Sequence, residues 1–440
     1  MFVNKFYGDN MDNVWISWNE NKKHPYKNSF EPTTELEICE IVKIAEKVRM
    51  IGTGKSSADI IAGTDTIISY EKFNQILSVD KENFTVSVQP GIRLKKLLQE
   101  LEKNEMAFPA LPDIDDITVG GAVATGTHGT GKIAQSLSEY IKRCKIVNAK
   151  GEVEIIDKND DRFNAVKVSI GLLGIFTEIT FQCIPRKVMN IIERPMKDTE
   201  WLSTYKTMLK ENDFLRILWL PHTDNGYVIT GNYIAEENRI NEKSGPWYYK
   251  YRRSLSKYLY GKAIAKPSRI ALSNKIIQKL FFSNKQQKFG SLYDATVTKS
   301  RGSTLELAEW TVAIDRFDEL FVEMKKELDS KSNNAYAHIP MDIRFMKSES
   351  GWLANGHGKD IVTVGCVSRN AENADNYEAF ELVEEIFLKY DGRPHWAKRF
   401  QIGEEILFTL YPKWSEFIEL RRKMDPDGKF LNEYLEGIFK

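Results

Sequence analysis

One stretch, Thr118–Gly131, constrains this chain more than any other part of its sequence, because its fourteen residues include five glycines and four threonines. Glycine lets the backbone adopt positive φ angles and approach a ligand closely. Successive backbone N–H groups in such a loop form an anion-binding concavity, to which threonine hydroxyls add donors. The stretch therefore predicts a diphosphate site, with a set of tight turns that bind nothing as the alternative.

Other motifs for nucleotides, metals and nucleophiles are absent or incomplete. No GxxxxGK[ST] loop occurs. A shorter glycine cluster, Gly52-Thr53-Gly54, precedes Thr118–Gly131 in the chain, so these two are called the first and second glycine clusters; the first has Ser57 where a dinucleotide fingerprint needs its third glycine. His128 has no second histidine near it in the sequence, and no HExxH or GxSxG motif exists. The four cysteines stand singly, which argues against a zinc site or a disulfide framework. We expect no metal, and we expect His128 to act as a hydrogen-bonding member of its loop.

Composition indicates an ordinary globular protein of two domains. The 440 residues include 62 Lys+Arg and 62 Asp+Glu, so net charge suggests no nucleic-acid partner. The N-terminus lacks the apolar core of a secretory signal, and no apolar run reaches the roughly 20 residues of a membrane helix. A cytoplasmic location is expected.

Helix and strand patterns alternate along the chain. Thr34 and Glu37 form the sequence signature of a capping box before a helix with apolar positions from Leu36 to Ala45. An amphipathic helix is expected at Leu94–Leu101, and a hairpin is expected to turn at Lys150-Gly151. Further strands and helices are expected at Val48–Ile51, Thr66–Ser69, Phe84–Val88, Phe214–Leu220, Leu305–Val312, Phe317–Leu328, Met341–Phe345, Ile361–Val367, Asn376–Lys389 and Trp414–Met424.

The segment Arg239–Lys288 differs from the rest in charge. It holds thirteen Lys/Arg and a single acid, Glu242, with tyrosines between them. It could rest on anionic lipid, bind a phosphorylated or lipid-linked sugar, or form a solvated face. All three interpretations stay open, so a peripheral membrane contact is one candidate role.

The two glycine clusters, in this order and separation, resemble the flavin domain of the vanillyl-alcohol-oxidase type. The chain looks similar to sugar-1,4-lactone oxidases such as L-gulonolactone and D-arabinono-lactone oxidases, with alditol oxidase beside them. The stretches that carry the resemblance span nearly the whole chain: Val48–Ile60, Val88–Leu94, Phe108–Gly131, Ser169–Thr180, Trp219–Asp224, Gly392–Lys398 and Asp425–Leu435.

The resemblance implies an α+β fold with an FAD-binding domain of the vanillyl-alcohol-oxidase/p-cresol-methylhydroxylase type and an α+β cap domain. The FAD-binding domain is expected at residues 1–187 and the cap at 188–390, with the basic insert at 239–288. Residues 391–440 are expected to return to the flavin. Expected FAD contacts are Ile51, Gly52, Thr53, Gly54, Lys55, Ser56, Ser57, Pro112, Asp113, Val119, Gly120, Gly121, Ala124, Thr125, Thr127, His128, Gly129, Gly171, Gly174, Ile175 and Lys398.

One departure from the family concerns attachment of the cofactor. Members with covalent FAD have a histidine after the Gly-x-Gly, bonded to the flavin 8-methyl carbon, and this chain has Lys55 there. An ammonium group is not expected to form that bond. We therefore predict non-covalent, dissociable FAD.

The resemblance also assigns catalytic candidates. An acid-x-Arg pair matches Asp342 and Arg344, which strand alternation places on one face, and the HWxK lysine matches Lys398. These groups would take the hydroxyl proton and stabilise the anionic reduced flavin. The family acid is usually glutamate, one methylene longer than Asp342. Glu309 is a further site candidate. An ordinary strand ion pair and a solvated lysine are the alternatives.

The resemblance implies oxidation of a CH–OH group in a sugar lactone, polyol or related sugar derivative by hydride transfer to FAD. Alditol oxidase has a serine where this chain has Ala122, which favours lactones or substituted sugars over alditols. Two alternatives remain at this stage. One is oxidation of another hydroxy substrate on the same scaffold, a 2-hydroxy acid or a phosphorylated or lipid-linked sugar. The other is a non-enzymatic, cationic nucleotide-binding adaptor.

Overall fold

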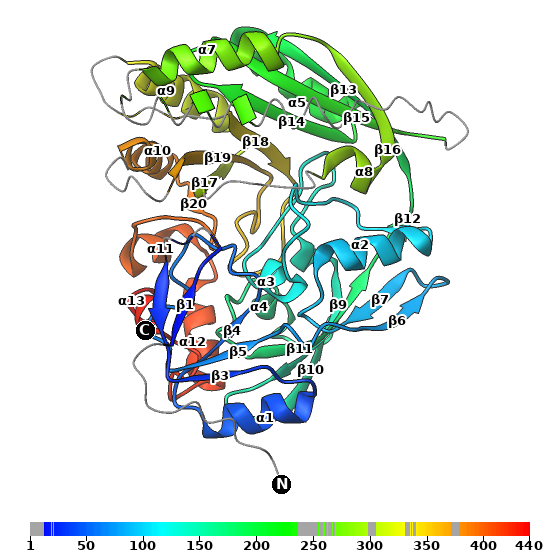
Figure 1. The fold of residues 1–440 in the computed structure, drawn as a ribbon, viewed down its shortest axis with the longest axis vertical. Helices are drawn as coiled ribbons and strands as arrows, with labels where there is room; N and C mark the ends of the chain where they lie inside the picture. Colours follow the sequence, from blue (N-terminus) through cyan, green and yellow to red (C-terminus); the bar gives the residue numbers. More distant parts are fainter. Residues whose placement is uncertain are drawn as a thin grey trace.

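The computed structural model describes residues 13–18, 20, 22–235, 254–255, 258–259, 262, 266, 269–297, 305–330, 335, 337, 340–370 and 378–440. Most of the basic segment between 239 and 269 lies outside these residues. The chain forms a lower part, with the N-terminal and C-terminal elements, and an upper part dominated by one large sheet (Figure 1).

Small sheets and short helices build the lower part. A three-stranded parallel sheet has the order β3-β5-β4, and a five-stranded antiparallel sheet has the order β10-β9-β11-β7-β6. The strands are β3 (Asn28–Phe30), β4 (Val48–Ile51), β5 (Thr66–Ser69), β6 (Ile76–Asp80), β7 (Thr85–Val88), β9 (Ile141–Val147), β10 (Val153–Asp157) and β11 (Ile175–Gln182). Two two-stranded sheets join β1 (Val14–Ile16) with β2 (Lys23–Pro25), and β8 (Met106–Ala107) with β12 (Ile184–Pro185).

Local sequence signals account for several of these elements. In α1 (Glu35–Ile44), the Thr34 side chain accepts from the Glu37 N–H and Glu37 caps the Thr34 N–H, so the predicted capping box is confirmed. The hairpin β9–β10 pairs Val147 with Val153, as its turn residues predicted. The remaining helices of the first 187 residues are α2 (Leu94–Lys103), α3 (Val119–Ala124), the 3₁₀ helix η1 (Leu137–Tyr140) and α4 (Phe163–Val166).

An eight-stranded sheet with the order β16-β13-β15-β14-β18-β19-β17-β20 forms the upper part. Its members are β13 (Val188–Lys197), β14 (Phe214–Leu220), β15 (Asn225–Ile234), β16 (Gln286–Ser291), β17 (Leu305–Ala313), β18 (Met341–Met346), β19 (Ile361–Asn370) and β20 (Arg393–Pro394). The helices of this region are α5 (Asp198–Glu211), α7 (Ile270–Phe281), α8 (Leu292–Thr296), α9 (Phe317–Asp329) and α10 (Glu378–Lys389).

The C-terminal helices α11 (Glu404–Leu410), α12 (Trp414–Met424) and α13 (Glu433–Phe439) lie beside the N-terminal strands in the lower part (Figure 1). Buried Arg49 of β4 donates to the Phe430 carbonyl at 2.9 Å, and Lys47 pairs with Glu436 at 2.7 Å. The C-terminal residues therefore hold the strand that leads into the first glycine cluster.

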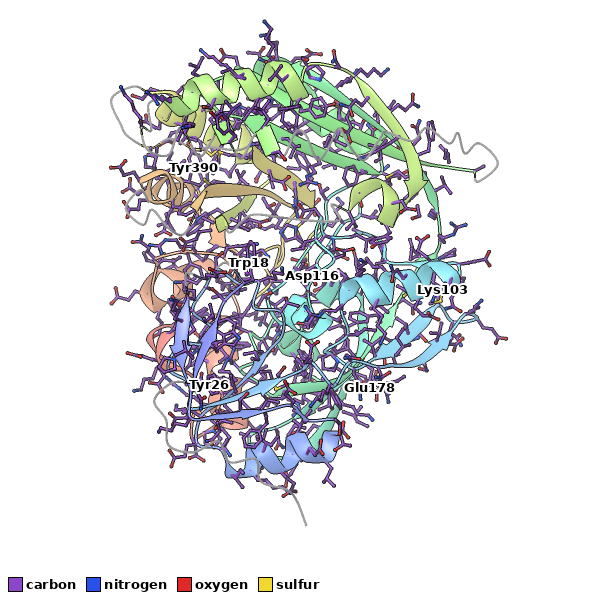
Figure 2. All side chains as sticks on the ribbon, viewed as in Figure 1. Trp18, Tyr26, Lys103, Asp116, Glu178 and Tyr390 are labelled. Carbon is purple, nitrogen blue, oxygen red and sulfur yellow. The ribbon has the colours of Figure 1, made fainter. Side chains whose placement is uncertain are left out.

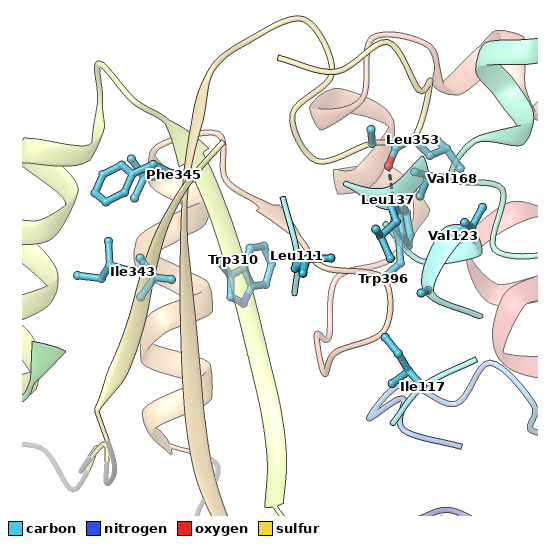
Figure 3. Close-up of a cluster of buried hydrophobic side chains, with 14 of the residues drawn as sticks. Leu111, Ile117, Val123, Leu137, Val168, Trp310, Ile343, Phe345, Leu353 and Trp396 are labelled. Carbon is cyan, nitrogen blue, oxygen red and sulfur yellow. Dashed lines mark hydrogen bonds between the residues drawn. The ribbon is translucent and has the colours of Figure 1, made fainter. Parts of the chain in front are cut away.

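One hydrophobic core runs through both parts. Figure 3 shows Trp310, Ile343 and Phe345 from the large sheet together with Val123, Val168 and Trp396 from the region around α3. The Trp396 indole donates to the Leu353 carbonyl at 2.7 Å. The predicted α+β class is confirmed, while the boundaries 187/188 and 390/391 stay predictions.

Candidate flavin site

The first glycine cluster lies in the loop after β4 and meets two segments that are distant in sequence. The Ser57 N–H donates to the Ala397 carbonyl at 2.7 Å, and the Ser56 hydroxyl donates to the same carbonyl at 3.1 Å. The His395 N–H donates to the Glu309 carbonyl of β17 at 2.9 Å. The loop at 52–57, strand β17 and the turn carrying Lys398 therefore converge, as the resemblance implied.

Five consecutive backbone N–H groups in the loop at 52–57, those of residues 52–56, have no hydrogen-bond acceptor within the described part of the chain. A Cβ added at Gly52 would lie 1.9 Å from the Thr118 Oγ1, so only glycine fits against α3 there. Gly52 and Gly121 both lie next to the Thr118 side chain, and both are exposed. A cluster of backbone N–H groups without acceptors in the described protein fits the diphosphate of FAD.

Lys55 is held by its own neighbours. Its ammonium group lies 3.2 Å from an Asp116 carboxylate oxygen and 5.0 Å from the Trp18 ring centre. The backbone N–H of Trp18 also donates to the Gly54 carbonyl at 3.2 Å, so the segment after β1 packs on the loop at 52–57. Trp18 and Asp116 are labelled in Figure 2, at the level where the lower and upper parts meet.

The second glycine cluster is fixed to β18. The Gly131 N–H donates to the Phe345 carbonyl and the Phe345 N–H donates to the Thr130 hydroxyl, both at 3.0 Å. The Arg344 guanidinium reaches the His128 carbonyl at 3.4 Å. The structure thus brings together two groups of predicted site residues that are more than 200 positions apart in the sequence: His128 and Gly129, and Asp342 and Arg344.

Arg216 of β14 is a site residue that the sequence analysis missed. Its guanidinium donates to both carboxylate oxygens of Asp342, at 2.8 and 2.7 Å, and contacts Asp113 at 3.1 Å. Arg344 contacts the same two acids, Asp342 at 2.6 Å and Asp113 at 3.1 Å. A single arginine in the otherwise apolar strand FLRILWL was the available signal, because a buried charge requires partners.

These ion pairs set the charge of Asp342. Burial raises the pKa of its carboxyl, but the positive charges of Arg216 and Arg344 outweigh burial and bring the pKa below its usual value. Burial lowers the pKa of Arg344, and the acids Asp342 and Asp113 more than reverse that effect. Asp342 is therefore a carboxylate that orients two guanidiniums. Its expected role as proton acceptor stays a prediction, which the low pKa disfavours.

His128, Glu309 and His395 form a second buried cluster. The His128 Nε2 lies 2.8 Å from a Glu309 oxygen, and the rings of His128 and His395 are 5.6 Å apart. Their ligand atoms all lie within 4.8 Å of one another, close enough to hold a metal ion. However, the Ala397 N–H donates to the His395 Nδ1 at 3.1 Å, which occupies that lone pair and leaves the proton on Nε2. A neutral His395 of this tautomer has no free lone pair for a metal.

Burial and neighbouring charges together set the charges of this cluster. Burial is the largest single effect on Glu309 and raises its pKa. The charge and hydrogen bond of His128, with His395 and Arg344 nearby, together bring that pKa well below its usual value. Burial lowers the pKa of His395 to about 3, so this ring is neutral at physiological pH. The Lys398 N–H donates to the His395 carbonyl at 2.9 Å, which places Lys398 in the same turn.

Several predicted FAD contacts have their backbone groups engaged within the protein. The Val119 and Gly120 N–H groups donate to Ile92 and Pro90 carbonyls, and the Thr125 hydroxyl donates to Gly121. Gly171 lies against the Arg49 guanidinium, Gly174 lies under the Val147 carbonyl, and Ile175 is buried in β11. Pro112 is buried, Thr127 donates its N–H to Ala122, and Ala124 is half-buried. The cofactor roles of all these residues stay predictions.

A small pocket lies between the second glycine cluster and the large sheet. It is only large enough for about one water molecule, and its charged side chains, Asp113, Arg216 and Arg344, are engaged in ion pairs. Its lining residues are Leu111, Asp113, Gly129, Thr130, Phe214, Arg216, Thr296 and Arg344.

Comparison with known proteins agrees with this geometry. An FAD-binding domain family matches residues 27–157, and the D-arabinono-1,4-lactone oxidase family matches residues 179–438. L-gulonolactone oxidase of Mus musculus is 28% identical over 425 residues, covering 93% of this chain and 94% of its own. L-gulono-1,4-lactone dehydrogenase of Mycobacterium tuberculosis is 26% identical over 447 residues, covering 97% and 99%.

A solved cholesterol oxidase from Brevibacterium sterolicum has the same fold, with a TM-score of 0.78 at 16% identity and 97% coverage of both chains. The predicted FAD-binding fold is therefore confirmed, and FAD is the cofactor. The matches do not favour the two alternatives, another hydroxy substrate or a non-enzymatic adaptor. The chain belongs to the D-arabinono-1,4-lactone oxidase family of FAD-dependent oxidoreductases.

Proposed function

We propose that this enzyme oxidises a CH–OH group of a sugar 1,4-lactone. The observation that carries the proposal is the placement of Arg344, which is paired with Asp342 on β18 and reaches the second glycine cluster through the His128 carbonyl. The sugar-lactone relatives named above are gulonolactone enzymes, and the matching family is named for D-arabinono-1,4-lactone. The family match covers the segments that hold Arg344 and Lys398.

In this proposal the protein binds and orients an uncharged, hydroxyl-rich substrate. Arg216 and Arg344 carry two positive charges and Asp113 and Asp342 carry two negative charges, so the pocket is neutral overall and rich in hydrogen-bonding groups. A charge-balanced network suits an uncharged lactone better than a sugar phosphate, whose charge would need an excess of cations. Lys398 adds positive charge beside the substrate, where an alkoxide develops. FAD, when bound, supplies the hydride acceptor.

Anaerobic reduction of the purified enzyme tests this proposal. L-gulono-1,4-lactone and D-arabinono-1,4-lactone are added separately, and the flavin absorbance is followed before air is admitted. Bleaching by a lactone supports the proposal, and retention of the oxidised spectrum with every lactone contradicts it. The rate of recovery in air then separates an oxidase from a dehydrogenase.

We also propose that α7 touches an anionic membrane surface. Leu272, Ile276 and Leu280 recur every four residues on α7 and are 61%, 36% and 50% exposed. Exposed Lys275 and Lys279 flank this apolar stripe, within a segment that carries thirteen Lys/Arg and one acid. An apolar stripe with flanking cations is typical of an interfacial helix. No helix of the described residues is long and apolar enough to cross a bilayer.

Co-sedimentation with vesicles tests the membrane proposal. Binding to vesicles with anionic lipid at low salt, weakened by Leu272→Ser/Leu280→Ser, supports it. Equal binding of the wild type and the double variant contradicts it, as does the absence of binding. Val322→Ser, which removes an exposed apolar side chain from α9, is the matched control.

A further inference from the structure

The contacts of His128 indicate that a proton is shared by His128 and Glu309 in addition to the one proton of a neutral imidazole ring. Both ring nitrogens of His128 face oxygen atoms. The Nδ1 lies 2.9 Å from the Gly129 carbonyl and the Nε2 lies 2.8 Å from the Glu309 carboxylate. A carbonyl oxygen can only accept, and a neutral imidazole has one donor nitrogen and one acceptor nitrogen. The Nε2–Glu309 contact therefore needs a second proton.

The surroundings keep that proton between these two residues. His128 is 4% exposed and the Glu309 side chain is 12% exposed, so water cannot compete for the contact. His395 stands next to both, but its Nδ1 accepts from Ala397 and its Nε2 holds the ring proton, so this ring has no lone pair to offer. Gly129 fits closely against the Leu111 backbone, which fixes the carbonyl that faces the His128 Nδ1.

Other charged groups face this pair from three segments. Arg344 on β18 acts on Glu309, and Glu349 in the segment after β18 is close enough to feel the charge of His128, while Lys398 in the turn after β20 acts on the neighbouring His395. If His128 were neutral, with its one proton on Nδ1 facing the Gly129 carbonyl, two lone pairs would face each other across the Nε2–Glu309 contact. A protonated Nε2 at 2.8 Å gives the buried Glu309 carboxylate a charged donor, while Arg344 is engaged by Asp342 and Asp113.

We propose that His128 is an imidazolium that pairs with Glu309, and that this pair positions β17 against the second glycine cluster. The imidazolium–carboxylate pair stands on these contacts and does not rest on the proposed function. His128 and Glu309 are positioning residues in this proposal.

NMR of the FAD-bound enzyme with ¹⁵N-labelled histidine tests the proposal without turnover. The chain has six histidines, and the His128 signals are assigned by their loss in His128→Gln. At pH 7.5 we expect both His128 ring nitrogens to be protonated in the wild type. In Glu309→Gln, where the carboxylate is gone, we expect the signature of a neutral ring.

Glu306→Gln is the matched control, because it removes another buried carboxylate from β17, one that pairs with Arg399 at 3.6 Å instead. It should leave the His128 signals unchanged. A neutral His128 in the wild type overturns the proposal, as does a protonated His128 in Glu309→Gln. The wild-type spectrum decides the matter alone if the variant does not fold. Failure of every lactone to reduce the flavin would overturn the proposed function and leave this pair standing.

Discussion

The Arg216 guanidinium donates two hydrogen bonds to the Asp342 carboxylate, at 2.8 and 2.7 Å, from the neighbouring strand of the large sheet. Arg344, two residues along β18 from Asp342, donates to one oxygen of the same carboxylate. The acid that sequence comparison assigns to chemistry is therefore part of a four-residue network with Asp113, and its main effect is to hold two guanidiniums toward the pocket.

Replacing Arg216 by Met should weaken both the fold and the reaction. The change leaves Asp113 and Asp342 with Arg344 as their shared partner, and breaking a buried ion pair costs about 3 kcal/mol. We expect a lower free energy of unfolding in urea and a lower kcat/KM for lactones. Arg194→Met, at an exposed position of β13, should change neither quantity. Wild-type turnover and stability in Arg216→Met would show that the network is dispensable.

Gly52→Ala should reduce FAD binding more than it reduces folding. The new methyl group would lie 1.9 Å from the Thr118 Oγ1, so the loop at 52–57 must shift away from α3 and its free N–H groups lose their arrangement. The measurement is FAD content per protein after dialysis. Gly403→Ala is the control, because no atom lies within 4 Å of its added Cβ. Full FAD occupancy in Gly52→Ala would contradict the assignment of the diphosphate to this loop.

FAD should dissociate from the denatured enzyme. Lys55 occupies the position of the linking histidine, and its ammonium is engaged by Asp116 and Trp18. After acid precipitation we expect the yellow colour in the supernatant. Colour retained in the washed pellet would mean that a covalent bond forms at another residue.

His395 should make the fold sensitive to acid. Burial lowers its pKa to about 3, while an unfolded histidine titrates near about 6.5. Between these values the unfolded chain binds a proton at His395 that the folded chain does not bind. The stabilising contribution of neutral His395 is therefore fully present above about pH 6.5, and below it the free energy of unfolding falls by about 1.4 kcal/mol per pH unit. His395→Asn keeps an acceptor for the Ala397 N–H and should flatten the fall of Tm between pH 7 and pH 5. His24→Asn, in the N-terminal hairpin, is the control and should leave the fall of Tm unchanged. An equal fall of Tm in the wild type and in His395→Asn would show that His395 is not the source of the acid sensitivity.

Local patterns predicted the elements well where the signal lies within a few residues. The capping box at Thr34 gave the start of α1, and Trp414–Met424 is a helix with the predicted limits. Strand alternation also predicted that Asp342 and Arg344 share a face, and their side chains are in contact. Such signals depend on spacing along one segment, which the sequence displays directly.

Contacts between distant segments could not be predicted from such local patterns. Arg216 lies 126 residues before its partner Asp342, and His128 lies 181 residues before Glu309. The isolated His128 of the sequence gains Glu309 and His395 as neighbours only because β17, the turn after β20 and the second glycine cluster converge. Resemblance to the family identified Glu309 and Lys398 as candidates, but the contact between Glu309 and His128 follows from the fold.

Anaerobic stopped-flow reduction of the wild type and Arg344→Ala tests the central claim most directly. Both proteins are mixed with L-gulono-1,4-lactone or D-arabinono-1,4-lactone, and bound FAD is quantified beforehand. We predict that a lactone bleaches the wild-type flavin and that Arg344→Ala, with FAD still bound, is reduced at least about a hundredfold more slowly, the scale for loss of one charge-stabilising donor. An unbleached wild type with every lactone, or equal rates in the two proteins, would contradict the account.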